Sequence, residues 1–490
     1  MIMKTVRTAS PLPRSLPEAQ GVPSTAISAF LNAMEQQQLG LHSFMLLRHG
    51  TVAAEGWWSP YRPELPHSLF SLSKSFTSTA VGLAAAEGLF SLQDKVVGFF
   101  PEDAPAEISP KLALMDISHL LMMGSGHTED TASHMLGSED GNWARAFLEL
   151  PVLKTPGTHF LYNTGATYML SAILQKVSGL TLLEYLEPRL FAPLGISNPT
   201  WESCPRGINA GGFGLSVTTE DIAKFGQLYL QQGMWNGRQL LSREWIASAT
   251  SRQIDNHDGS TDAGTSDWSQ GYGYLFWRCR HGAYRADGAF GQFCIVMPEQ
   301  DAVLAITSGS SDMQSIMNGV WEHLLPAMKT EPGDTGSGSA AAAELTALLD
   351  HLSIPPERPH SASALESVVD GNAYRLEENP LQLGSFAVSF DDSKAVLTLQ
   401  AMSGEQTVTL GRGEWAESSA QILNHATNLI MASFTWTTED KLKLTLLFVE
   451  TPFCLSMEAT FGESSVVLKQ QFNVSMSAKD LEAVTVGHLA

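Results

Sequence analysis

The stretch SLSKSFTSTAVGLAAAEG, residues 71–88, places a serine and a lysine three residues apart at the start of an apolar helical run. Residues three apart on a helix share a face, so Ser71 and Lys74 lie within hydrogen-bonding reach. A serine hydroxyl is a weak nucleophile until a base takes its proton, and a lysine whose pKa is depressed by burial can do so. If Ser71 begins the helix, its N–H points at any oxyanion formed there. Taken alone, the same spacing is also produced by a capping serine and a surface lysine.

A second element of the same kind lies at residues 156–165, PGTHFLYNTG, where a Pro-Gly turn leads to Tyr162 just before another helical pattern. A phenol beside two cations can lose its proton and act as a general base. The alternative is a tyrosine packed at the entrance of a helix.

Four landmarks in order carry a resemblance to a known family: residues 71–96 (SLSKSFTSTAVGLAAAEGLFSLQDKV), 116–127 (DISHLLMMGSGH), 156–179 (PGTHFLYNTGATYMLSAILQKVSG) and 210–230 (AGGFGLSVTTEDIAKFGQLYL). Together they resemble the serine β-lactamase and penicillin-binding-protein superfamily, in particular its class C–like branch, which includes esterases, D-amino-acid peptidases and amidases. The resemblance spans roughly residues 17–326. It implies that Ser71 is the acylated nucleophile, Lys74 its proton partner and Tyr162 the first residue of the tyrosine element. It also implies a five-stranded antiparallel sheet flanked by helices, with an all-helical lobe.

The sequence departs from the family pattern at two places. Where the tyrosine element usually has Asn two residues on, this chain has Thr164, with Asn163 between. Thr164 donates and accepts single hydrogen bonds but lacks the two-ended amide that holds a substrate carbonyl.

The third family element is a basic residue, a small residue and a glycine, and its best match is Ala286-Asp287-Gly288. The basic residue is missing, and the neighbouring Arg285 points to the opposite face of a strand. Since that basic residue holds the carboxylate of a β-lactam, its absence counts against a true β-lactamase or transpeptidase. The N–H of Ala289 still falls where the second oxyanion donor belongs, and Asp287 could meet a substrate amine.

The chain divides by composition into three parts. Residues 1–330 mix helical and strand patterns, and the strands at both ends of this part, including one expected at Tyr272–Cys279, are expected to share one sheet. Residues 331–354 form a linker with a short helix, beginning with the Gly/Ser-rich EPGDTGSGSAAAA at 331–343. Residues 355–490 contain seven or so short segments of alternating apolar and polar residues, which predict an antiparallel, lipocalin-like β-barrel or a sandwich. The interior of a small barrel is more often filled by side chains than by a ligand.

Composition excludes several classes of protein. With 51 acidic and 29 basic side chains, the net charge of −22 repels nucleic acids and anionic membrane surfaces. The four cysteines form no CxxC pair, and buried free thiols are favoured over a Cys279–Cys294 disulfide. With no apolar run of membrane-spanning length and no signal-like N-terminus, we expect a cytoplasmic protein. The sequence leaves open whether the protein forms a homo-oligomer.

These observations predict a serine hydrolase that needs no metal or cofactor and acts on a small ester or amide through an acyl-enzyme at Ser71. The expected oxyanion donors are the N–H groups of Ser71 and Ala289. A D-amino-acid peptidase or amidase and a β-lactam hydrolase are the alternatives within the family. A non-catalytic binding protein derived from a hydrolase is the alternative from a different class.

Overall fold

The computed structural model describes residues 11–259, 262–329, 340–358, 362–423, 427–477 and 481–490. Most of the predicted Gly/Ser-rich linker therefore lies outside the described residues. Its last residues, 340–343, are the first turn of helix α13 (Ala340–Asp350), which packs against α1 (Ser24–Gln36) and β2 (Thr51–Trp57).

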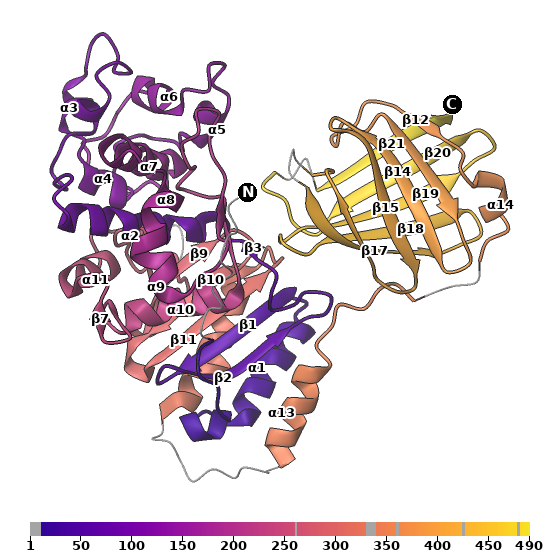
Figure 1. The fold of residues 1–490 in the computed structure, drawn as a ribbon, viewed down its shortest axis with the longest axis horizontal. Coiled ribbons are helices and arrows are strands. Elements are labelled where there is room, and N and C mark those ends of the chain that lie inside the picture. Colours follow the sequence, from indigo (N-terminus) through magenta and orange to yellow (C-terminus); the bar gives the residue numbers. More distant parts are fainter. Residues whose placement is uncertain (1–10, 260–261, 330–339, 359–361, 424–426, 478–480) are drawn as a thin grey trace, which may run out of the picture.

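An antiparallel sheet of six strands organises the first part of the chain, in the order β2-β1-β11-β10-β9-β8 (Figure 1). Besides β2, its strands are β1 (Leu41–Arg48), β11 (Ala302–Ser308), β10 (Gln292–Met297), β9 (Tyr284–Gly288) and β8 (Trp277–Arg278). The first and last segments of this part thus share one sheet, as predicted. The strand expected at Tyr272–Cys279 was wrong in length, because Leu275 has a left-handed backbone (φ 62°) and only two residues pair with β9.

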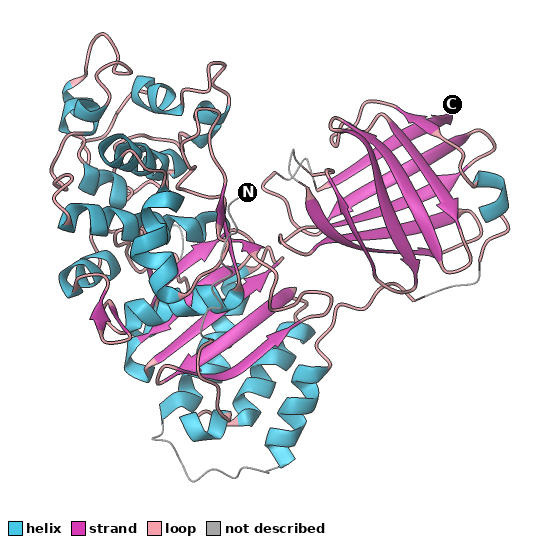
Figure 2. Ribbon diagram, in the orientation of Figure 1, coloured by secondary structure: helices cyan, strands magenta, loops and turns pink. Residues whose placement is uncertain are grey.

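One face of this sheet packs on α1, α12 (Met313–Gly319) with its continuation Val320–Leu324, and α13. The other face packs on α2 (Ser73–Ala86) and α10 (Thr219–Leu230), and beyond them lies the helical lobe (Figure 2). The lobe contains α3 (Pro110–Leu114), α4 (Ile117–Leu121), α5 (Ala132–Leu136), α6 (Trp143–Glu149), α7 (Thr164–Ser178), α8 (Leu182–Leu186), α9 (Ala192–Leu194) and α11 (Arg243–Thr250). Short strands β3 (His67–Ser68), β5 (Leu215–Val217) and β4 (Thr200–Trp201) form a small sheet, and β6 (Met234–Trp235) and β7 (Arg238–Gln239) form a hairpin.

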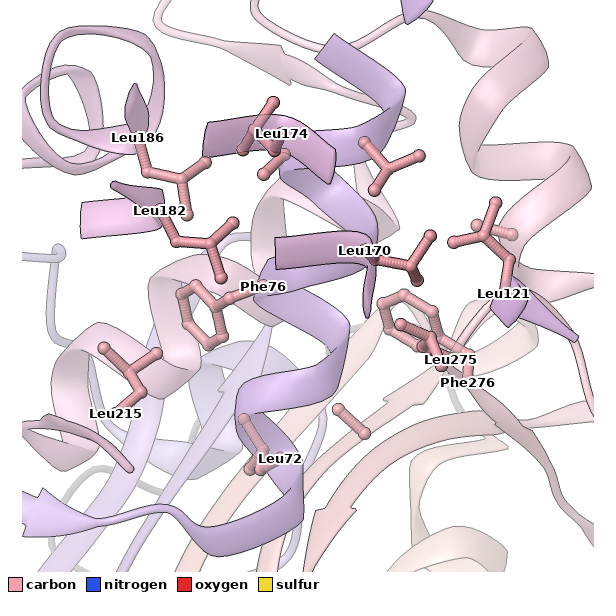
Figure 3. Packing of buried hydrophobic residues seen from close by; sticks show 14 of the residues in the cluster. Leu72, Phe76, Leu121, Leu170, Leu174, Leu182, Leu186, Leu215, Leu275 and Phe276 are labelled. Atoms are coloured by element: carbon pink, nitrogen blue, oxygen red, sulfur yellow. The ribbon is translucent and has the colours of Figure 1, made fainter. Parts of the chain in front are cut away.

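Helix α2 is the centre of the core between the sheet and the lobe. Eleven of its fourteen residues are buried, so it is covered on nearly all sides rather than along one stripe. Phe76 stacks on Phe225 of α10 with ring centroids 3.9 Å apart, and leucines of α7 and α8 lie close to the same helix (Figure 3). This packing fixes the first turn of α2, which contains Lys74, and the turn just before it, which contains Ser71.

The C-terminal part is a closed barrel with more strands than the seven or so predicted, and its strand pairs are antiparallel except for the parallel pair β15–β17 that closes it. Nine described strands form the closed ring, in the order β15-β14-β13-β12-β21-β20-β19-β18-β17, and β15 pairs with β17 to complete it. Strand β16 (Ala416–Ala420) pairs with β17 outside the ring, and helix α14 (Glu366–Val369) precedes the first strand. The strands of the ring are β12 (Tyr374–Leu376), β13 (Ser385–Phe390), β14 (Lys394–Ala401), β15 (Gly404–Arg412), β17 (Asn428–Trp436), β18 (Lys441–Phe448), β19 (Cys454–Phe461), β20 (Ser465–Phe472) and β21 (Glu482–Leu489).

The barrel is docked on the sheet side of the first part. Tyr61 packs against Met431, Leu447 and Val449 on the outside of the barrel, and the Trp415 indole N–H donates to the Ile354 carbonyl at 2.9 Å.

All four cysteines are free. Among the described residues, no helix combines the length and apolar character that crossing a membrane requires.

Candidate active site

Ser71 lies in a single 3₁₀ turn, η2 (Phe70–Leu72), immediately before α2. The helix itself therefore begins two residues later than a start at Ser71 would require. Ser73 holds this turn in place: its hydroxyl donates to the Phe70 carbonyl at 2.6 Å and accepts from the Leu215 N–H at 3.1 Å. Ser71 is partly exposed while the residues that follow it are buried, so its hydroxyl is accessible at the end of a rigid element.

Lys74 is buried, with 1% of its surface exposed, and its ammonium nitrogen points at Ser71. Its Nζ lies 2.9 Å from the Ser71 Oγ, 2.8 Å from the Gly212 carbonyl oxygen and 3.5 Å from the Thr164 Oγ1. Burial lowers the pKa of Lys74 to about 7, although the negative charges of Asp130 and Asp287 act in the opposite direction. A lysine with this pKa is neutral for a large fraction of the time near pH 7 and can accept a proton.

Tyr162 stands next to Lys74, with its ring centroid 4.8 Å from the Lys74 Nζ. Its ring stacks on Trp277 at 5.3 Å and meets Tyr272 edge-on at 6.3 Å. Burial raises the pKa of the Tyr162 phenol well above its usual range, and the charge of Asp287 raises it further. The phenol is therefore neutral in this environment, so it carries a proton that it can give to a strongly basic leaving atom, and it cannot act as a base in that form.

The end of β9 runs directly against the turn that carries Ser71. A Cβ added to Gly288 would lie 2.0 Å from the Leu69 carbonyl oxygen and 3.1 Å from the Leu72 nitrogen, so only glycine fits. This close approach places the partly exposed Ala289, the next residue, beside Ser71. The sequence-predicted pair of oxyanion donors is thus brought together by two elements that are more than two hundred residues apart in the chain.

Two phenylalanines with left-handed backbones flank these two residues. Phe70 (φ 49°) precedes Ser71 and Phe290 (φ 68°) follows Ala289, and their rings meet edge to face at 5.4 Å. Non-glycine residues adopt this conformation at a cost and are enriched at functional sites. Both rings also contact Phe453 of the barrel, at 6.0 and 5.8 Å.

Asp287 is already paired within the protein. Its Oδ2 accepts from the Arg285 Nε at 2.8 Å, and both side chains are buried. Burial raises the pKa of Asp287 while the Arg285 charge lowers it. Arg285 also donates to the Asp267 carbonyl at 2.8 Å and lies over the ring of Trp268. Asp287 therefore borders the site as half of an ion pair, not as a free carboxylate.

Asn163 does not reach the site. It is fully buried at the start of α7, where its Oδ1 accepts from the Thr131 hydroxyl at 2.8 Å and the Gly165 N–H at 3.1 Å, and its Nδ2 faces the Ser125 hydroxyl at 3.3 Å. It shapes the loop that presents Tyr162 and Thr164.

Asp130 is the site residue that sequence reasoning missed. Its Oδ1 accepts from the Thr164 N–H at 2.9 Å, and its charge acts on the pKa values of Lys74 and Tyr162. No motif spacing links Asp130 to Thr164, since they are 34 residues apart and only the fold of the lobe joins them.

The model of the Beta-lactamase family matches residues 27–318, which is more than half of the chain. The chain belongs to the β-lactamase family. The match ends before the first barrel strand, so the barrel lies outside the family's part of the chain.

Relatives of this β-lactamase-family chain have more than one activity. It is 26% identical over 308 residues to the 6-aminohexanoate-dimer hydrolase of Paenarthrobacter ureafaciens, covering 59% of this chain and 78% of that protein. A Bacillus anthracis structure named as a candidate 6-aminohexanoate-dimer hydrolase superposes with a TM-score of 0.52 at 19% identity, over 64% of this chain and 86% of the other. EstCE1, described as a hydrolase with promiscuous acyltransferase activity, superposes with a TM-score of 0.50 at 16% identity, over 61% and 98%. These two structures share the fold of this chain.

Proposed function

We propose that this protein is a serine hydrolase that cleaves small esters through an acyl-enzyme formed at Ser71. The observation that carries the proposal is the buried Lys74, whose amine lies 2.9 Å from the Ser71 Oγ and whose pKa is lowered to about 7. The neutral amine is positioned to take the hydroxyl proton as the oxygen attacks a carbonyl carbon. This is the class C–like arrangement in which Ser71, Lys74 and Tyr162 act as one unit.

In the first step, the Ser71 Oγ bonds to the carbonyl carbon and its proton passes to Lys74. The N–H groups of Ser71 and Ala289 stabilise the oxyanion. The neutral phenol of Tyr162, next to Lys74, then donates a proton to the leaving oxygen or nitrogen as the bond from that atom to the carbon breaks, and Lys74 returns a proton to the phenolate. In the second step, water attacks the acyl carbon and gives a proton to Lys74. The bond between the carbon and the Ser71 Oγ then breaks, and Lys74 returns the proton to that oxygen, which leaves the free acid and the starting enzyme.

The preference for esters rests on the surroundings of the family's third element. Ala286 replaces the basic residue, and Arg285 is bound to Asp287, so a cation for a substrate carboxylate is missing at that place. An amidase is the second candidate, and it is favoured by the similarity to the 6-aminohexanoate-dimer hydrolase. A D-amino-acid peptidase is less favoured, since Asp287 is occupied by Arg285. Comparing p-nitrophenyl acetate with a D-alanine p-nitroanilide and a linear aliphatic amide separates the three.

The proposal is tested by the intact mass of the protein after exposure to a fluorophosphonate. We expect one adduct on the wild-type chain and none on Ser71→Ala. Tyr162→Phe should slow the hydrolysis of an alkyl ester, whose alkoxide needs a proton, by one to two orders of magnitude. Folded protein without an adduct would overturn the hydrolase and favour the non-catalytic binding protein. Full activity in Tyr162→Phe would remove the tyrosine from the mechanism.

A further inference from the structure

One end of the barrel faces the catalytic turn. The Ser68 N–H, three residues before Ser71, donates to the Glu450 carbonyl at 2.8 Å. Asn473 connects the same end of the barrel to the hydrolase part, because its Nδ2 donates to the Gly309 carbonyl at 3.2 Å and to the Pro452 carbonyl at 2.9 Å. The loop between β18 and β19 is therefore held against the hydrolase part, and Phe453 is its last residue before β19.

This end of the barrel contains a cavity of about 300 Å³. Its apolar lining includes Phe453, Phe472, Leu381 and Leu423, and its polar lining includes Gln470. The volume is at the lower end of the range for small-molecule sites, which are mainly apolar with a few placed polar groups.

Gln470 is the unusual member of this lining. It is 3% exposed, and neither the oxygen nor the nitrogen of its amide has a hydrogen-bond partner among the described residues. Along β20 it shares the inward face with Val466 and Leu468, both completely buried, and it pairs with Ala483 of β21. Burying an amide without partners costs free energy that an apolar side chain would not.

Thr485 is a second polar residue on the interior face of the barrel, further from this end than Gln470. It pairs with Leu468, so it lies on the same interior face, and its hydroxyl is buried without a partner in the described chain. A barrel interior that only packs side chains together gains no stability from burying these two polar groups without hydrogen bonds. Of the two, Gln470 lines the cavity, so a molecule in the cavity would supply a partner for its amide.

We propose that the end of the barrel facing Ser71 binds a small, mainly apolar molecule that carries a carboxamide or hydroxyl group. The polar group hydrogen-bonds to Gln470, and the apolar part lies against Phe453 and Phe472. The wall formed by Phe453 is shared with the active site, because this ring also contacts Phe70 and Phe290, next to Ser71 and Ala289. A molecule bound in the cavity therefore affects Ser71 through the contacts of Phe453.

The binding is tested in the full chain carrying Ser71→Ala, so the result does not depend on the proposed chemistry. The neutral fluorophore N-phenyl-1-naphthylamine reports occupation of the cavity, and octanamide displaces it. In Gln470→Leu we expect octanamide to bind about tenfold more weakly, the effect of one to two lost hydrogen bonds, while the fluorophore binds within about twofold. Gln471→Leu, on the exposed outer face of β20, is the matched control and leaves both affinities unchanged.

Two results would overturn the proposal: no uptake of the fluorophore by folded protein, or equal octanamide affinity in the parent and in Gln470→Leu. A cavity-filling variant gives an independent check. Ala483→Phe places a ring opposite Gln470 and should abolish fluorophore binding. Leu423→Trp, a loop residue lining the same cavity, serves if Ala483→Phe does not fold. Unchanged binding in a folded filled variant contradicts the site.

The bound molecule is either the distal part of the substrate or a separate ligand, and kinetics on the wild-type enzyme distinguishes them. If octanamide competes with p-nitrophenyl octanoate but not with p-nitrophenyl acetate, the cavity holds the substrate's tail. If it changes the rate of fluorophosphonate labelling without competing with either ester, it is a separate ligand acting through Phe453. Both outcomes support the site, whereas loss of labelling in every sample would count only against the proposed hydrolase.

Discussion

Lys74 in the hydrolase part and Gln470 in the barrel are both buried polar side chains, yet their surroundings are opposite. The Lys74 amine has three oxygen neighbours within 3.5 Å, all supplied by the chain. The Gln470 amide has none among the described residues. Each burial costs stability. The protein offsets the first cost with its own atoms, whereas the described residues offer no hydrogen bond that offsets the second.

The difference teaches how to distinguish a reacting group from a binding group. The contacts of Lys74 are complete because it must hold one position relative to Ser71 before any substrate arrives. Those of Gln470 are missing because its partner comes from outside. Phe453 connects the two regions, since it contacts the residues next to Ser71 and Ala289 on one side and lines the Gln470 cavity on the other. The predictions below test each region and this connection.

Removing the Lys74 amine should have the largest effect. In Lys74→Met, which keeps most of the volume, the Ser71 hydroxyl loses its proton acceptor, and we expect fluorophosphonate labelling to slow by about a thousandfold or more. Intact-mass time courses measure this rate.

Lys224→Met is the control for that variant, because Lys224 is also buried, on α10, and its neighbours are Glu220 and Asp221. It should label at the wild-type rate. If the two lysine variants slow labelling equally, the effect of Lys74 is structural, and the base has been misassigned.

Phe453→Ala should have the next largest effect, although this residue belongs to the barrel. Without this ring, Phe70 and Phe290 lose a shared contact, and the two proposed oxyanion donors that they flank, Ser71 and Ala289, are less firmly placed. Small misplacements in an active site cost up to about a hundredfold in rate, so we expect labelling to slow by ten- to a hundredfold. Phe390→Ala, inside the barrel near Trp436, is the comparison, and equal slowing there would mean that barrel stability, not contact with the site, is responsible.

The pH dependence of labelling should follow Lys74. Because burial lowers its pKa to about 7, the reactive neutral amine predominates above pH 7 and the unreactive ammonium below it. Labelling should therefore rise about tenfold from pH 6 to pH 8 and then level off. The raised pKa of Tyr162 keeps the phenol protonated throughout this range. A rate that climbs steadily to pH 10 would indicate that Lys74 has an ordinary pKa.

Much of the hydrolase part could be predicted from sequence because its signals are local. Ser71 and Lys74 lie one helical turn apart, and the strand patterns at both ends of this part correctly predicted a shared sheet. Asp130 and Phe453 could not be predicted, since each reaches the site only through tertiary packing. In the barrel, the alternating strands were visible, but β16 has no apolar side chain apart from alanines, β12 has only three residues, and Val484 of β21 is largely exposed. Those strands are formed by pairing with their neighbours rather than by their own pattern.

The smallest predicted effect separates the two regions most directly, because saturating ligand should cancel most of it. Replacing the Gln470 amide, which has no partner among the described residues, by leucine should raise the free energy of unfolding of the barrel by about 1–2 kcal/mol, because a buried amide without hydrogen bonds is exchanged for an apolar group. Urea unfolding followed by circular dichroism measures this, with Gln471→Leu expected to change nothing. Saturating octanamide should then stabilise the wild-type barrel more than the variant, because a ligand that binds only the folded state stabilises it in proportion to its affinity. A Gln470→Leu barrel that is less stable than wild type in the absence of ligand would mean that the amide is satisfied within the protein, and the contrast with Lys74 would fail.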